Sequence, residues 1–126
     1  MAVRSWLNQI IESRQKSVGE ISVVMCSDKR LLEVNQKYLN HDFYTDIITF
    51  DYSEGCEVSG DLMISYERVK ENAAGQKVTV QHELRRVMVH GVLHLLGFKD
   101  KTEEDAAEMR SKEDAALDLF HVEHSK

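Results

Sequence analysis

The chain of 126 residues has no proline and only two cysteines. Without proline, which averages about 5% of residues, its turns must rely on Gly, Asn, Asp and Ser. Cys26 and Cys56 show no CxxC or paired metal-ligand spacing, which indicates two reduced thiols and a cytoplasmic protein. No apolar run approaches the roughly 18 residues of a transmembrane helix, and the polar-apolar start does not resemble a secretory signal. We therefore expect no membrane partner.

An excess of positive charge is also missing, since 16 Lys and Arg face 22 Asp and Glu, for a net charge of −6. This excludes a domain that holds nucleic acid by bulk charge alone. The charge is unevenly distributed, however. Residues 68–86 contain five basic and two acidic side chains, whereas residues 100–118 contain eight acidic and three basic ones. A modest basic face is therefore expected despite the negative total.

The chain is long enough, and at 42% hydrophobic residues apolar enough, for one core. Gly19 and Gly75 are expected to end the first and third helices. The order α-β-α-β-β-α-α-α predicts an α/β (α+β) single-domain sandwich over residues 1–126, with five helices packed on a small mixed sheet. The expected helices cover residues 3–17, 28–39, 66–74, 80–96 and 103–120, and the expected strands cover residues 20–26, 46–52 and 61–65.

The segment HGVLHLLGFKD, residues 90–100, contains candidate metal ligands. His90 and His94 stand at positions i and i+4 of the expected helix, so both imidazoles lie on one face. Gly97 can end the helix in the left-handed conformation, and the chain can then bring Asp100 back toward the histidines. Two imidazoles and one carboxylate hold a tetrahedral Zn²⁺ and leave one position open, as catalytic sites require. The site is thus predicted on a long helix and the turn that follows it.

The same spacing overlays the metzincin protease pattern HExxHxxGxxH. That pattern has a glutamate after the first histidine, where it acts as general base, and this chain has Gly91. Without a carboxylate at this position, peptide hydrolysis lacks its usual proton acceptor. Hydrolysis assisted by a metal ion nevertheless remains available.

The segment also resembles the metal motif HGxLHLxGYDH of the bacterial YbeY-type endoribonucleases, the rRNA maturation factors. Residues 45–50, TDIITF, resemble the T-D-V-L-S-F segment of that family, and residues 60–65, GDLMIS, resemble its G-D-I-x-I-S strand. Met109 and Glu113 match an M-x-x-x-E pattern that follows the metal loop. Together these motifs cover most of the chain, about residues 31–117.

This resemblance implies a single-strand-specific, metal-dependent endoribonuclease that acts in late 16S rRNA 3′-end maturation and ribosome quality control. It implies one Zn²⁺ ion, with other divalent cations possible, held by His90, His94 and the residue at position 100. The implied partners are precursor rRNA and the small ribosomal subunit in the cytoplasm, with no DNA substrate. The cleavage site, the general acid or base and the oligomeric state stay open.

Two positions depart from the family pattern. The third ligand of the family is histidine, whereas this chain has Asp100, which is also a zinc ligand. An anionic ligand lowers the net charge at the metal and can admit harder cations such as Mn²⁺. Many members have an arginine, implicated in catalysis or RNA contact, where this chain has Leu39.

Replacements for that arginine can be proposed from the sequence. Arg86 lies four residues before His90, one turn away on the same helical face, and is the first candidate for a phosphate contact. Asp46 is a weak candidate for the base. Phe43 and Tyr44, in the expected loop, are candidates for stacking on unpaired bases. The other nearby aromatic residues, Tyr38 and Phe50, are expected in the core.

Two rival functions remain open at this stage. The first is a metallopeptidase with metzincin-like spacing, which Gly91 argues against. The second is a ribosome assembly factor without catalytic activity, in which the zinc is structural. A fourth protein ligand closing the site would favour the structural role, and the plausible donors outside the motif are Cys26, Cys56 and His82.

Overall fold

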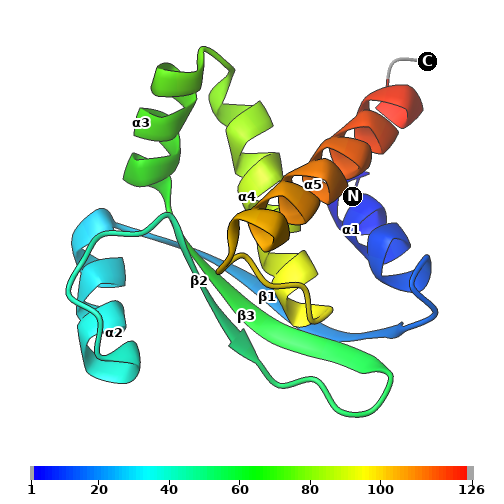
Figure 1. The fold of residues 1–126 in the computed structure, drawn as a ribbon, viewed down its shortest axis with the longest axis horizontal. Coiled ribbons are helices and arrows are strands. Elements are labelled where there is room, and N and C mark those ends of the chain that lie inside the picture. The colour runs from blue at the N-terminus through cyan, green and yellow to red at the C-terminus, as the bar shows by residue number, and fades with distance from the viewer. Residues whose placement is uncertain (1, 125–126) are drawn as a thin grey trace.

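The computed structural model describes residues 2–124, and within them five helices pack around a three-stranded sheet (Figure 1). The sequence-based prediction of a small α+β fold with a mixed sheet is confirmed. The elements in chain order are α1 (Ala2–Glu12), β1 (Ser17–Cys26), α2 (Asp28–Leu39), β2 (Ile47–Asp51), β3 (Glu57–Ser65), α3 (Tyr66–Gln76), α4 (Val80–Leu95) and α5 (Glu103–His124).

The sheet has the strand order β1-β3-β2. Strand β3 pairs with β2 in antiparallel register, Ile48 opposite Met63, and with β1 in parallel register, Val23 opposite Leu62. Strands β2 and β3 are consecutive in the chain and pair as a hairpin. The parallel pairing with β1 requires the crossover that α2 and β2 supply, because parallel neighbours cannot be joined by a tight turn.

Alternate residues of the strands face two different hydrophobic layers, as strand geometry requires. Leu62 and Ile64 belong to the main core, which also contains side chains of α1, α4 and α5. Ile48 belongs to a smaller cluster on the opposite face, where Leu31 and Val34 of α2 cover the sheet and Met63 packs against them. Helix α4 therefore lies between the sheet and the outer helices, which makes it the rigid element on which a site can be built.

Four helix starts follow the capping chemistry that short polar side chains provide. In each case the side-chain oxygen of the capping residue accepts a hydrogen bond from a backbone N–H in the first turn. The capping residues are Ser27 for α2, Ser65 for α3, Thr79 for α4 and Thr102 for α5. These starts match the sequence-based expectation.

The two glycine stop signals were wrong. Gly19 lies inside β1, and α1 ends at Glu12, where the chain turns through Gln15 at φ 61°. Gly75 lies inside α3, which continues to Gln76 and ends on Lys77 at φ 58°. In both turns a longer residue adopts the left-handed conformation that glycine usually supplies.

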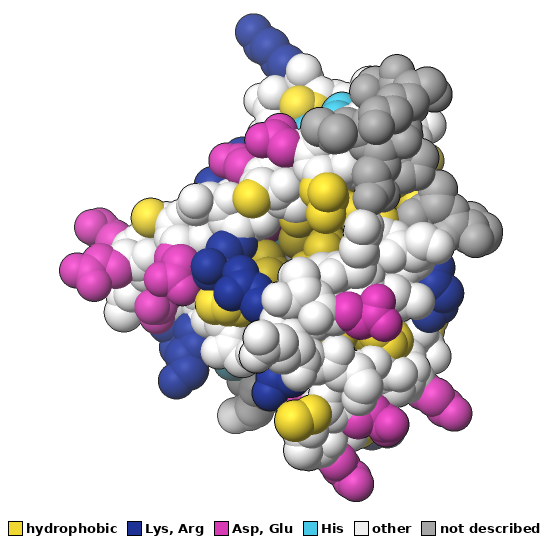
Figure 2. Space-filling model, turned by 90° about the vertical axis from the view of Figure 1, so that its right-hand side faces the viewer, with side chains coloured by type: hydrophobic (Ala, Val, Ile, Leu, Met, Phe, Trp, Pro, Cys, Tyr) yellow, Lys and Arg dark blue, Asp and Glu magenta, His cyan; other side chains and the backbone are white. Residues whose placement is uncertain are grey.

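The surface departs from expectation at Tyr38, which is 61% exposed and meets Phe50 edge to face rather than joining the core. On the face drawn in Figure 2, charged side chains of both signs are interspersed around hydrophobic ones. Over the described residues, no helix combines the length and apolar character needed to cross a bilayer.

Candidate metal centre

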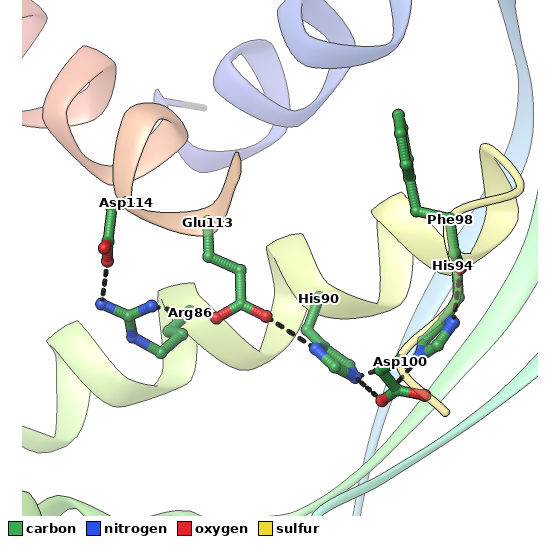
Figure 3. Close-up of polar contacts among 7 residues, drawn as sticks. All are labelled: Arg86, His90, His94, Phe98, Asp100, Glu113 and Asp114. Atoms are coloured by element: carbon green, nitrogen blue, oxygen red, sulfur yellow. Dashed lines mark hydrogen bonds and ion pairs between the residues drawn. The ribbon is translucent and has the colours of Figure 1, made fainter. Parts of the chain in front are cut away.

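Helix α4 presents Arg86, His90 and His94 along one face at four-residue intervals (Figure 3). After the helix ends, Gly97 adopts φ 100°, and the N–H of Phe98 donates to the carbonyl oxygen of Leu93. This left-handed turn reverses the chain, as the sequence predicted. The following loop brings Asp100 back over the two histidines.

Three potential ligand atoms converge at this turn. The Nε2 atoms of His90 and His94 are 3.0 Å apart, and Oδ2 of Asp100 lies 3.2 Å from the first and 3.4 Å from the second. Among the described residues, these three form a group able to hold a metal ion. The donor set of two imidazoles and a carboxylate is one that Zn²⁺ accepts in hydrolytic sites.

The other ring nitrogen of each histidine is already engaged. Nδ1 of His90 lies 2.6 Å from Oε2 of Glu113, and Nδ1 of His94 lies 3.0 Å from the carbonyl oxygen of Phe98. Because both partners are hydrogen-bond acceptors, Nδ1 of each histidine carries the proton. The lone pair of each Nε2 then points toward the metal-binding group. Such outer contacts fix the tautomer and the ring orientation of metal-binding histidines.

Glu113 belongs to a chain of charges that joins α4 to α5. Its Oε1 accepts from Arg86 at 2.9 Å, and Arg86 also bonds Asp114 at 2.7 Å. Glu113 is 4% exposed, so its charge is neutralised by partners rather than by water. Burial alone would lower the pKa of His90, but the hydrogen bond and charge of Glu113, with the charge of Asp100, raise it above its ordinary value.

Asp46 lies just before β2 and lines the site beside His90 and Asp100. Burial raises the pKa of Asp46, while the nearby His90 and two backbone hydrogen bonds partly counteract that rise. A carboxylate whose pKa is raised is a stronger proton acceptor than an ordinary aspartate. The structure thus brings Asp46 to the site together with Arg86 and the three expected ligands.

The potential fourth ligands lie outside the group. Cys26 and Cys56 are free thiols, and the ring of His82 packs against His121 with 5.7 Å between centroids. Among the described residues, the metal-binding group therefore contains three donors. Three protein ligands leave a coordination position for water or substrate, which is typical of catalytic rather than structural zinc sites.

Gly91 faces the sheet and not the ligands. A Cβ atom at this position would lie 2.7 Å from Cδ1 of Ile47 and 2.8 Å from Cδ2 of Leu62. The glycine thus permits the close approach of α4 to β2 and β3, where an added Cβ would press on side chains of both strands. A side chain at this position would start toward the sheet rather than toward the ligands, so the general base of the metzincin pattern has no counterpart here.

Two cavities meet at the metal-binding group. One, of about 460 Å³, is lined by residues of α3, α4 and α5, and the other, of about 480 Å³, is lined by residues of α2, β2 and the loop between them. Asp46, His90 and Asp100 line both cavities. The metal-binding group therefore borders open space on two sides.

The second cavity contains the position at which the family arginine is missing. Leu39 lines it together with Phe43 and His41, whose rings stack at 5.1 Å. Phe43 is 55% exposed, as expected for a residue that stacks on a base. Tyr44 instead lies under the guanidinium of Arg68, at 5.3 Å from its ring centre, and does not line this cavity.

Sequence reasoning did not foresee the contacts of Glu113 and the Phe98 carbonyl oxygen. The sequence places Glu113 in a short family pattern but predicts no contact for it. A single glutamate on an acidic helix does not differ in sequence from its exposed neighbours. Its helical register gave a partial hint, since it lies four residues after Met109, which is buried. The backbone acceptor at Phe98 has no side-chain signal at all.

Comparisons with known proteins agree with this geometry. A family model described as Endoribonuclease YbeY matches residues 1–121. An Endoribonuclease YbeY of Flavobacterium psychrophilum is 55% identical over 121 residues, which are 96% of this chain and 86% of that protein. One of Christiangramia forsetii is 49% identical over 120 residues, 95% of this chain and 84% of that protein.

The fold has a solved counterpart. The solution structure of TM1509 from Thermotoga maritima matches with a TM-score of 0.68 and 26% identity, covering 96% of this chain and 80% of that one. The family match extends over nearly the whole chain and includes every residue of the metal-binding group. The chain therefore belongs to the Endoribonuclease YbeY family.

Proposed function

We propose that this protein is a metal-dependent endoribonuclease specific for single-stranded RNA, and that residues 1–126 form one domain. Its family consists of nucleases that hydrolyse phosphodiester bonds in RNA, which makes RNA the substrate class. The observation that carries the proposal is the convergence of His90, His94 and Asp100 between two cavities.

The proposed substrate is precursor rRNA, with the small ribosomal subunit as partner. Within this proposal the enzyme acts in late 16S rRNA 3′-end maturation and in ribosome quality control, in the cytoplasm where ribosomes are made. The resemblance of the metal motif and of residues 45–50 and 60–65 to the family supports this assignment. DNA is not a proposed substrate.

The proposed cofactor is one Zn²⁺ ion held by His90, His94 and Asp100. When bound, such a cation lowers the pKa of a coordinated water and neutralises charge on phosphoryl oxygens. The contacts to Nδ1 of both histidines support this ligand set, because they hold Nε2 toward the centre. Asp100 as an anionic ligand extends the set of acceptable metals to harder cations such as Mn²⁺.

Asp46 is the proposed proton acceptor. Its carboxylate lines both cavities beside His90, where it can take a proton from the attacking water. A positioned base of this kind contributes about 10²–10⁴-fold to a rate. The raised pKa of Asp46 supports this role, because a carboxylate with a higher pKa accepts a proton more readily than an ordinary aspartate.

Arg86 remains the proposed cationic contact near the scissile phosphate, since it lines the first cavity. Its ion pairs with Glu113 and Asp114 also give it a positioning role, because they hold Glu113 against His90. A phosphate that bound Arg86 would compete with the exposed carboxylate of Asp114. Phe43 is the proposed stacking platform in the second cavity, and Tyr44 a more distant one.

The metallopeptidase alternative is weaker because Gly91 supplies no carboxylate and faces the sheet rather than the ligands. Cleavage assays with a labelled single-stranded RNA and a labelled peptide separate the two activities. We expect RNA cleavage by the native protein, loss of cleavage after chelation and in His94→Ala, and a rate that falls as salt rises. Peptide cleavage that depends on His94, with RNA left intact even beside ribosomal subunits, would reverse the assignment.

A further inference from the structure

The loop of residues 40–46, between α2 and β2, forms one wall of the 480 Å³ cavity beside the metal-binding group. In Figure 1 it runs from the end of α2 back to the start of β2. His41 and Phe43 of this loop line the cavity together with Leu39, the last residue of α2. Phe43 and Asp46 have roles in the proposed function, whereas the imidazole of His41 has none.

Asn35 holds this loop in place from inside the protein. It is 2% exposed, its Nδ2 donates to the carbonyl oxygen of Phe43 at 2.9 Å, and its own carbonyl oxygen accepts from the N–H of His41 at 3.1 Å. The rings of His41 and Phe43 stack with 5.1 Å between centroids and 22° between planes. Asp42, between them, does not line the cavity, and its Oδ1 accepts from Gln36 at 2.5 Å. The imidazole is thus positioned before a substrate arrives, which reduces the ordering that binding requires.

The imidazole of His41 is a nitrogen donor of this cavity that has no other hydrogen-bond partner among the described residues. Four of the side chains that line the cavity carry nitrogen, namely Asn35, His41, His90 and His94. Asn35 donates to the backbone of the loop, and the two metal-binding histidines are engaged at Nδ1. The ring of His41 makes only its stacking contact with Phe43 within residues 2–124. Its nitrogen atoms are therefore available to a ligand.

The charges of the cavity make a phosphate depend on such a donor. Asp46 and Asp100 contribute two carboxylates, and the described residues of the lining include neither lysine nor arginine. Arg86 lines the other cavity, where carboxylates of α5 pair with it. Apart from the metal ligands, His41 is thus the side chain of the described lining that can carry a positive charge.

We propose that His41 binds a backbone phosphate of the RNA in this cavity, beside the base that stacks on Phe43. The inference rests on the proposed function, because it takes single-stranded RNA as the substrate. An imidazole N–H donates to a phosphoryl oxygen, and such hydrogen bonds are strong when a partner is charged. Unpaired bases stack on aromatic rings regardless of their sequence. His41 and Phe43 together therefore hold one nucleotide next to the metal-binding group, on the wall where Leu39 offers no polar contact.

A cycle that combines one protein change with one RNA change tests this contact. Short labelled single-stranded RNAs carry one uncharged methylphosphonate linkage, which is moved along the strand one position at a time. Fluorescence anisotropy measures their binding to the parent and to His41→Ala, and gel electrophoresis confirms that the RNA stays intact. We expect His41→Ala to bind the unmodified RNA about three- to tenfold more weakly. At one linkage, methylphosphonate should weaken binding to the parent by a similar factor and hardly affect binding to His41→Ala.

Two further variants separate this contact from general effects on the surface. His41→Arg keeps a cationic donor and should remain sensitive to the same linkage as the parent. His121→Ala removes an exposed histidine of α5 that lines neither cavity, and should bind every RNA as the parent does. In cleavage assays, His41→Ala should raise KM and leave kcat nearly unchanged, because the contact forms when the substrate binds.

Equal affinities of the parent and His41→Ala overturn the inference, and so does methylphosphonate that weakens both proteins equally at every linkage. A parent protein that binds no RNA overturns it as well. Cleavage of RNA by the parent without coupling between His41 and any linkage removes this contact and leaves the nuclease intact. Coupling at one linkage, in a protein that cleaves no RNA, supports the contact and removes the proposed function.

Discussion

Oε2 of Glu113 lies 2.6 Å from Nδ1 of His90, although 23 residues separate them in the chain. The contact joins α5 to α4 and turns an acidic helix into part of the metal centre (Figure 3). Oε1 of the same carboxylate binds Arg86, so its charge is shared between a cation and an imidazole. The orientation of His90 therefore depends on the packing of two helices and not on its own helix alone.

Replacing Glu113 tests this dependence. In Glu113→Ala, His90 loses its Nδ1 acceptor, and we expect Zn²⁺ affinity to fall about 10–100-fold, as for other contacts that orient metal-binding histidines. Competition with a chelating indicator measures the change. Asp114→Ala is the matched control, because it removes only the more exposed partner of Arg86. Equal affinities in the two variants would show that Glu113 does not orient His90.

The third ligand can be tested by exchange. Asp100→His should retain the metal, because imidazole and carboxylate both reach zinc at about 2.0–2.2 Å. Asp100→Ala should bind it much more weakly, and the double variant His90→Ala/His94→Ala should lose it. Elemental analysis after dialysis measures the metal content. An alanine variant at position 100 that holds metal as tightly as the parent would remove Asp100 from the ligand set.

Substituting alanine for each of two helical glycines should change the free energy of unfolding in opposite directions. Gly91→Ala forces a Cβ against Ile47 and Leu62, and we expect unfolding free energy to fall by about 1–3 kcal/mol. Gly75→Ala adds a Cβ with nothing within 4 Å in the exposed part of α3, and should raise it by about 0.5–1 kcal/mol. Denaturant titration of both variants gives the comparison. A stabilised Gly91→Ala would mean that α4 has room to withdraw from the sheet.

Glu83 should make stability depend on pH. Burial, with the charge of Asp46, raises its pKa in the folded protein, so the native state holds the proton more tightly than the unfolded chain. Its contribution to stability is therefore complete below the ordinary value of 4.5 and declines as pH rises through the raised pKa. Glu83→Gln lacks this decline, so its advantage over the parent should grow over that range and then level off. Urea titrations at several pH values measure the difference, and a constant offset would contradict the shift.

The sequence alone determined the local parts of the centre. The i,i+4 spacing places His90 and His94 on one face because the helical repeat demands it, and Gly97 ends the helix because it adopts a positive φ without strain. The starts of the four capped helices could also be predicted, since capping depends on residues within one turn. The glycine stops expected at positions 19 and 75 were wrong, because Gly19 lies inside β1 and α3 continues past Gly75 to Gln76.

The basic face expected from the sequence is the feature that tertiary contacts change most. The basic stretch over residues 68–86 suggested a face for RNA, but α5 and α2 bring carboxylates to it. Arg86 pairs with Glu113 and Asp114, and Arg68 pairs with Asp28 from 40 residues away. Local composition cannot show this, because the neutralising partners come from distant segments.

Which atoms can bind a metal follows from residues 90–100 alone, because ligand type and helical spacing are local properties of that segment. The other features of the site depend on contacts between distant segments. Only the packing of α5 on α4 gives His90 its acceptor, only the approach of α4 to the sheet explains Gly91, and only the arrangement of three helices creates the cavity around Glu83. These features arise where segments distant in the chain bury each other's surfaces, which no single stretch of residues specifies.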